Sequence, residues 1–271
     1  MSASSPSQII SLKKVKFLYR GRSILDLPNF DLNSDETCVL MGPNGAGKTT
    51  FLRVLLGLQK ITQGSITLLG KELQNISRGQ LSKLRQQIGY IPQIASLSYE
   101  FPLTVREAVS TGKTASIGCL RKLSSSDYDS INFWMKQLGI IHLADRRIDE
   151  ISGGECRKLL IARAMVQEPA LLLMDEPTAN LDMGWREQIL TIIQELYQKT
   201  RKALILVCHE LEVIPPCCRR VLLLNKGKIE SDTPIQKAFT PENIQKLYHC
   251  RMQILQKNDR FFTIPEFSQP N

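Results

Sequence analysis

The residues with the clearest chemistry are 42–50, which read GPNGAGKTT. They fit the pattern G-x-x-x-x-G-K-[ST], in which glycines let backbone N–H groups curl around a phosphate. Lys48 would add a positive charge beside the β- and γ-phosphates, and the Thr49 hydroxyl could bind Mg²⁺. The pattern requires a strand before it and a helix after it, and residues 38–41 and 51–58 are predicted to supply them, with the helix N-terminus facing the phosphates. This run therefore predicts a nucleotide-binding site.

A second chemical signal is a pair of carboxylates that follows an apolar run. Residues 171–174 are Leu-Leu-Leu-Met and predict a buried strand, and Asp175 and Glu176 come directly after them. A carboxylate at the end of such a strand can hold Mg²⁺ beside a phosphate loop, and Asp175 is placed to do so through water. Because the strand ends there, the Glu176 side chain should point in another direction than that of Asp175. Glu176 is then the natural general base, or water-orienting group, for attack of water on a γ-phosphate.

A third signal is the run Ser152-Gly153-Gly154-Glu155. Ser152 and Glu155 have the spacing of a capping box, which predicts that a helix begins here. The two glycines between them would expose backbone N–H groups and make a second anion site. Since one nucleotide does not need two phosphate sites from one chain, the simplest arrangement is a dimer that holds each nucleotide between the loop of one copy and this helix of the other.

Composition and charge exclude several classes of protein. The chain has 271 residues, 42% hydrophobic and 23% charged, which is ordinary for a globular protein with one large or two small domains. No apolar run is long enough to span a bilayer, and the first residues lack the pattern of a signal peptide, so we expect the chain on the cytoplasmic side. The net charge of +9 comes from scattered basic pairs, which favours an anionic membrane surface or acidic partner loops over nucleic acid.

Cysteine spacing gives no sign of a metal or disulfide framework. The chain has 7 cysteines and no C-x-x-C pair. An odd number without paired spacing is typical of reduced thiols that pack as small apolar side chains.

The pattern of elements predicts an α/β fold with a mixed sheet at its core. Short strands are expected over residues 8–35, and residues 203–207 form a second fully apolar run that is typical of a central parallel strand. Residues 94–163 have helical patterning and are predicted to be a helical insertion between two strands of the nucleotide-binding sheet. We expect the main domain to cover residues 1–239 and residues 240–271 to form a short appendage with a helix and two strands.

At this point the chain resembles the nucleotide-binding subunit of an ABC (ATP-binding cassette) transporter over residues 10–235. The motifs of that family occur here in the family order, with small departures such as Glu155 where many members have glutamine. The matching residues are Tyr19, 42–50, Gln93, 152–155, Asp175, Glu176, 179–182 and His209. The resemblance implies a phosphate-loop NTPase of ABC type with an antiparallel β subdomain, and with the helical subdomain between Gln93 and the signature motif at Ser152.

The resemblance also implies a role for each matching residue, with ATP and Mg²⁺ as cofactors. Tyr19 would stack on adenine, although a tyrosine in a strand is ordinarily a packing residue. The remaining ATP contacts would come from Gly42, Pro43, Asn44, Gly45, Ala46, Gly47, Lys48, Thr49 and Thr50. Catalysis would involve Glu176, His209, Gln93 and Lys48, and Mg²⁺ would be held by Thr49, Gln93 and Asp175. Ser152, Gly153, Gly154 and Glu155 would contact the partner's nucleotide, and Asp182 would lie in the loop at the dimer contact.

The kind of transporter is a weaker expectation that rests on two segments. Residues 101–109, FPLTVREAV, and residues 240–248 are similar to segments of metal-chelate importer ATPases, which serve iron–siderophores, haem and cobalamin and have zinc and manganese relatives. The expected partners are a second copy, integral-membrane permease subunits and a solute-binding protein, at the cytoplasmic face of the membrane and without nucleic acid. An exporter, a soluble non-transport ABC ATPase and a nucleic-acid-linked ABC ATPase stay open as alternatives.

Overall fold

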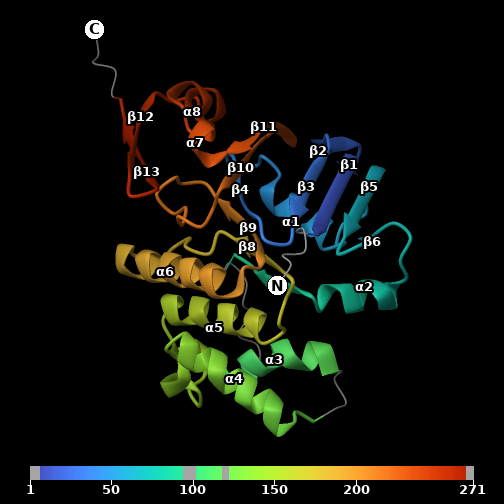
Figure 1. Ribbon diagram of the computed structural model, residues 1–271, viewed down its shortest axis with the longest axis vertical. Coiled ribbons are helices and arrows are strands. Elements are labelled where there is room, and N and C mark those ends of the chain that lie inside the picture. The colour runs from blue at the N-terminus through green and yellow to red at the C-terminus, as the bar shows by residue number, and fades with distance from the viewer. Residues whose placement is uncertain (1–6, 94–101, 118–121, 267–271) are drawn as a thin grey trace, which may run out of the picture.

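The structure is a computed structural model that describes residues 7–93, 102–117 and 122–266 (Figure 1). Among these residues, no helix combines the length and the apolar character that a membrane span requires. Of the segment 101–109 used above, Phe101 lies outside the described residues, as do residues 94–100 of the helical insertion.

A six-stranded sheet forms the centre of the molecule, in the order β11–β10–β4–β9–β8–β7. Strands β10, β4, β9, β8 and β7 run parallel, and β11 pairs with β10 in the antiparallel direction. The strands are β4 Thr37–Met41, β7 Ile88–Ile91, β8 Leu171–Asp175, β9 Ala203–Cys208, β10 Arg220–Asn225 and β11 Lys228–Pro234. The predicted α/β fold is confirmed, and the helical insertion lies between β7 and β8.

The central strands are buried on both faces, because alternate side chains enter two separate apolar clusters. In β4, Val39 packs into one cluster and Leu40 into the other. The first cluster joins the sheet to the helical insertion and the C-terminal helix, whereas the second joins it to α1, at Lys48–Leu55, and to the antiparallel sheet. This double burial explains why β4, β8 and β9 read as unbroken apolar runs.

The antiparallel sheet contains one strand, β1, that is longer than the short strands predicted over residues 8–35. Its members are β1 Gln8–Tyr19, β2 Arg22–Leu27, β3 Phe30–Asn33, β5 Gln63–Leu68 and β6 Lys71–Glu72. Residues 9–10 and 15–17, which lie in the stretch predicted to hold short strands, belong to one strand that carries an irregularity between Lys13 and Lys16. At this point Lys14 has a φ of 47°, so the alternation of faces changes within the strand and makes it look like two in sequence.

Several helices stack in a layer on one side of the central sheet, and the others lie singly elsewhere around it (Figure 1). The remaining helices are α2 Arg78–Arg85, α3 Val105–Ile117, α4 Ser125–Gln137, α5 Gly153–Met165, α6 Met183–Thr200, α7 Ile235–Ala238 and α8 Pro241–Tyr248, with short 3₁₀ turns at Ile141–Leu143 and Ile148–Glu150. Helix α1 begins three residues before its predicted start at 51. It ends early because Gly57, with a φ of 64°, turns the chain away.

The C-terminal residues fold onto the rest of the chain. After α8, strands β12 Met252–Lys257 and β13 Arg260–Pro265 form a hairpin. Ile244, Leu247 and Phe261 are buried in the same apolar cluster as the helical insertion. All six cysteines in the described residues, from Cys38 to Cys250, are free.

Candidate nucleotide site

Four neighbouring parallel strands end at one edge of the central sheet and carry the predicted site residues there. Strand β4 leads into the glycine loop, β9 is followed by His209, β8 ends at Asp175, and β7 leads to Gln93. In open α/β sheets, ligands bind outside the carboxyl ends of the strands. The structure accordingly has an open cavity of about 510 Å³ at this edge.

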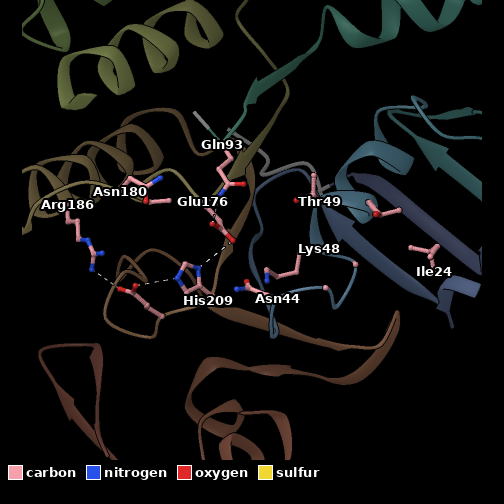
Figure 2. A pocket seen from close by; sticks show the side chains of 14 residues that line it. Ile24, Asn44, Lys48, Thr49, Gln93, Glu176, Asn180, Arg186 and His209 are labelled. Atoms are coloured by element: carbon pink, nitrogen blue, oxygen red, sulfur yellow. Dashed lines mark hydrogen bonds and ion pairs between the residues drawn. The ribbon is translucent and has the colours of Figure 1, made fainter. Parts of the chain in front are cut away.

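Residues from all of these elements line the cavity (Figure 2). The lining residues are Ile24, Asn44, Gly45, Gly47, Lys48, Thr49, Thr50, Gln93, Glu176, Ala179, Asn180, Arg186, His209 and Glu210. The predicted Lys48, Thr49, Gln93, Glu176 and His209 thus meet at one place. Ile24 and Arg186 are members that the sequence did not single out, whereas Asn180 belongs to the 179–182 segment expected at the dimer contact.

The glycine loop holds Lys48 by its own backbone. The Lys48 ammonium donates to the carbonyl oxygens of Gly42, at 2.8 Å, and Pro43, at 3.1 Å. Burial lowers the pKa of Lys48, and the carboxylates of Glu176 and Asp175 oppose that shift. Glycine is required at position 42, because a Cβ there would lie 2.0 Å from the Leu224 carbonyl oxygen. The loop therefore presents a buried cation at the floor of the cavity.

Asp175 and Thr49 form an oxygen-rich corner beneath the loop. Asp175 is 2% exposed, and its Oδ1 lies 3.5 Å from the Thr49 hydroxyl oxygen. Burial raises the pKa of Asp175, while the bond from Thr49 lowers it. Two hard oxygen donors at this distance suit a divalent cation such as Mg²⁺, which takes few protein ligands and completes its shell with water and phosphate.

Glu176 is one of the residues that line the cavity, and Figure 2 shows its carboxylate between Gln93 and His209. Its φ of 49° places it in the left-handed region, and its backbone N–H donates to the Val207 carbonyl oxygen at 3.1 Å. The Gln93 amide donates to Glu176 Oε2 at 2.8 Å, and His209 Nδ1 lies 3.5 Å from Oε1. The carboxylate is therefore oriented from two sides by polar side chains, as a general base requires.

A chain of polar contacts continues from His209 to helix α6. His209 Nε2 lies 3.4 Å from Glu210 Oε1, and Arg186 donates to Glu210 Oε2 at 2.7 Å. Arg186 Nε also donates to the Leu181 carbonyl oxygen at 3.0 Å, which fixes the guanidinium. Neither Glu210 nor Arg186 was among the residues that the sequence assigned to the site.

Arg157 is a buried charge close to the site. Arg157 belongs to one of the scattered basic pairs of the sequence, yet it is 1% exposed because it lies on the apolar face of α5, three and four residues before Leu160 and Ile161. Its Nη1 donates to the Pro92 carbonyl oxygen at 2.9 Å, next to Gln93. Burial lowers the pKa of Arg157 to about 10, so it stays charged at neutral pH. The spacing to Leu160 and Ile161 was the signal that could have found it.

The predicted capping box opens helix α5. Ser152 Oγ accepts from the Glu155 N–H at 3.3 Å, and Glu155 Oε2 accepts from the Ser152 N–H at 2.8 Å. None of residues 152–155 is among the residues that line the cavity. Within a single chain, the structure does not bring this second anion site to the phosphate loop.

The Trp185 ring closes the space above Gly154. A Cβ at Gly154 would lie 2.0 Å from Trp185 Cδ2, so the backbone of α5 touches the indole of α6. We expect Gly154→Ala to destabilise the protein by about 1–3 kcal/mol, the usual cost of overpacking. Urea denaturation measures this free energy of unfolding.

Two further variants make the Gly154 experiment specific. Gly79→Ala is the matched control, since a Cβ there meets nothing within 4 Å. In a Trp185→Ala background the added methyl has room, so the penalty of Gly154→Ala should largely disappear. An equal penalty in both backgrounds would show that the indole is not its cause.

Tyr19 and Asp182 lie outside the set of cavity-lining residues. Tyr19 is 54% exposed at the end of β1, with the Arg20 guanidinium 5.5 Å from its ring centroid. Asp182 caps helix α6, and its Oδ1 accepts from the Trp185 N–H at 2.9 Å.

Comparison with known proteins agrees with this geometry. The family model described as ABC transporter matches residues 25–179. An uncharacterized ABC transporter ATP-binding protein of Haemophilus influenzae is 33% identical, over 95% of this chain and 96% of that protein. The manganese transport system ATP-binding protein MntB of Bacillus subtilis is 30% identical, over 91% of this chain and 94% of that protein.

A solved structure extends the match to the whole fold. It is described as an inward-facing conformation of a metal-chelate type ABC transporter, with a TM-score of 0.81 and 30% identity. The match covers 96% of this chain and 98% of that one. The family model, the relatives and the fold together show that this chain belongs to the ABC transporter family, as one of its ATP-hydrolysing, ATP-binding subunits.

Proposed function

We propose that the chain hydrolyses ATP in the 510 Å³ cavity with Glu176 as the general base. Backbone N–H groups of residues 42–50 and the ammonium of Lys48 would bind the phosphates. The Glu176 carboxylate would take the proton from the attacking water, while Gln93 and His209 orient that carboxylate and the γ-phosphate. The convergence of Lys48, Gln93, Glu176 and His209 on one cavity is the observation that carries this proposal.

We also propose Mg²⁺ as the second cofactor. Thr49 and Asp175 would hold it together with Gln93, since their oxygen donors and the burial of Asp175 fit a hard divalent cation. When bound, such an ion neutralises developing charge on the β- and γ-phosphate oxygens. Burial raises the pKa of Asp175 and the charge of Glu176 adds to that shift, whereas the hydrogen bond from Thr49 and the charge of Lys48 favour the carboxylate anion that the ion would require.

The working form that we propose is a dimer of two such chains. Residues 152–155 lie at the start of a helix whose exposed N–H groups suit a phosphate, yet they do not line the cavity of their own chain. A second copy would bring its Ser152 motif to this cavity, with Asp182 near the contact. ATP would then favour the closed dimer because it contacts both chains only in that state.

The transport reaction that we propose is import of a metal ion or a metal chelate, such as iron–siderophore, haem or cobalamin. A metal-chelate type transporter and a manganese transport ATPase are among the similar proteins, which supports this class. A zinc or manganese importer is the alternative within the class, and a relative from Treponema pallidum is a zinc transport system ATP-binding protein. A soluble, non-transport ABC ATPase is the alternative outside it.

For the assembly, we propose integral-membrane permease subunits and a solute-binding protein as partners, with the chain peripheral at the cytoplasmic face. Residues 1–239 would form the ATPase domain, with its helical subdomain at about 94–163 docked on the permease. Residues 240–271 would form the appendage, and no nucleic acid would take part.

The test is a pull-down from native membranes with the Glu176→Gln variant and ATP, followed by mass spectrometry. A polytopic membrane protein together with a solute-binding protein would support an importer, and the ligand of that binding protein would identify the cargo. Recovery of soluble assembly factors alone would overturn the transport proposal while leaving the ATPase chemistry intact. The Lys48→Ala variant is the control for ATP-dependent capture.

A further inference from the structure

The loop that carries His209 is held from outside by the C-terminal appendage. This loop, residues 209–219, follows β9 and contains no regular element before β10. One side of it faces the cavity, where His209 approaches Glu176 and Glu210 pairs with Arg186. The other side contacts α8 and β13, which lie beside it in Figure 1. The placement of His209 therefore depends on two sets of contacts from distant parts of the chain.

Tyr248, the last residue of α8, reaches the backbone of His209 itself. Its hydroxyl donates to the His209 carbonyl oxygen at 3.3 Å, and its ring packs against the main apolar cluster. Burial raises the pKa of Tyr248, so the hydroxyl stays protonated and able to donate at neutral pH. Tyr248 does not line the nucleotide cavity, so any effect on the reaction would pass through His209.

Three residues further along the loop, Glu212 is bound to β13 by its side chain and its backbone. Thr263 donates from its backbone N–H and from its hydroxyl to Glu212 Oε1, at 2.7 and 2.6 Å. Arg260 donates through Nη2 to the Glu212 carbonyl oxygen at 2.7 Å. The same guanidinium forms a bidentate pair with Glu187 of α6, at 2.7 and 2.9 Å. Arg260 thus joins the loop, the hairpin and the helix that carries Arg186.

From these contacts we propose that the appendage is a positioning element for catalysis, in which Tyr248 and Arg260 hold the His209 loop so that the imidazole faces Glu176. This rests on the proposed function, because it assigns His209 a role in the reaction. Loss of either contact lets the loop move, lowers the fraction of molecules with His209 in place, and slows hydrolysis. The affinity for ATP is unaffected, since the phosphate loop is on another strand.

The experiment compares steady-state ATP hydrolysis by the wild-type protein and by the Tyr248→Phe and Arg260→Ala variants. Tyr248→Phe keeps the ring and removes only the donor, so we expect kcat to fall about 2- to 10-fold with KM for ATP unchanged, the usual worth of one hydrogen bond. Arg260→Ala should have the larger effect, because its contacts are charge-assisted. Tyr128→Phe and Arg251→Ala are matched controls that should keep the wild-type kcat. Tyr128 is an exposed residue of α4, and Arg251 is the exposed residue directly before β12.

A double-mutant cycle separates positioning of His209 from a general loss of stability. The rate of hydrolysis is measured by single turnover of labelled ATP. In a His209→Ala background, Tyr248→Phe should cause no further loss of this rate. The proposal would be overturned if both appendage variants kept the wild-type kcat. It would also be overturned if their losses multiplied with the loss caused by His209→Ala. If Glu176→Gln also turned over at the normal rate, the proposed catalytic site itself would fail, which is a distinguishable result.

Discussion

Glu176→Gln is expected to reduce ATP hydrolysis by about 10²- to 10⁴-fold, the usual contribution of a general base, while ATP still binds. Glutamine has the shape of glutamate but cannot accept the proton of the attacking water. The Gln93 amide, which donates to Glu176 Oε2 at 2.8 Å, can donate to the amide oxygen of the variant instead. The geometry of the site should therefore persist while the chemical step is lost. Phosphate release measures the rate, and an ATP titration measures the affinity.

Glu195→Gln is the matched control for that variant. Glu195 lies on α6, pairs with Lys199 at 3.6 Å, and is 56% exposed, so its charge is remote from the reaction. Near-normal hydrolysis by Glu176→Gln would contradict the assignment of Glu176 as the base. Slow hydrolysis combined with lost ATP binding would show instead that the carboxylate supports the site structurally.

The same variant also tests the two-chain arrangement, because it should accumulate the ATP-bound state. If residues 152–155 of a second copy complete the site, the variant should become a dimer when ATP is added and return to a monomer when ATP is removed. Light scattering during gel filtration measures this mass change. A variant that binds ATP tightly and stays monomeric at all concentrations would argue against the shared site.

Local patterns predicted well where the candidate site residues lie on the strands and helices. The glycine loop, the Asp175–Glu176 pair and the Ser152 capping box are each determined by neighbours within a few residues, and the structure places each at the predicted end of a strand or helix. The central strands were also predictable, since burial on both faces requires unbroken apolar runs. Convergence of the strand ends follows from parallel pairing, so the meeting of Lys48 and Glu176 could be expected as well.

Other features depend on contacts that local patterns do not encode. Helix α2 fully buries only Leu84, with Leu81 partly buried one turn before it, so its apolar stripe is short and its capping box at Ser77 and Gln80 is its clearest local signal. Arg186 and Tyr248 act on the His209 loop across 24 and 39 residues of sequence. Arg157 resembled a surface charge because its partner is a backbone carbonyl, which has no sequence signature.

Lys48→Ala is expected to weaken ATP binding by roughly 10- to 100-fold, the value of a charge-assisted hydrogen bond at a partly desolvated site. Lys48 is 7% exposed and is already oriented by the carbonyl oxygens of Gly42 and Pro43. A phosphate would replace those weak acceptors with a stronger one at little conformational cost. Isothermal titration with ATP, and with ADP for comparison, measures the loss.

The comparison between nucleotides makes the Lys48 prediction specific to the phosphates. If the ammonium serves the β- and γ-phosphates, the loss should be greater for ATP than for ADP, because ADP lacks the γ-phosphate. Lys60→Ala, at an exposed position after α1, is the control and should bind both nucleotides normally. An unchanged ATP affinity would contradict the role of Lys48. An equal loss for ATP and ADP would instead mean that Lys48 mainly holds the loop through Gly42 and Pro43, so that the glycine loop, rather than the cation, supplies the affinity.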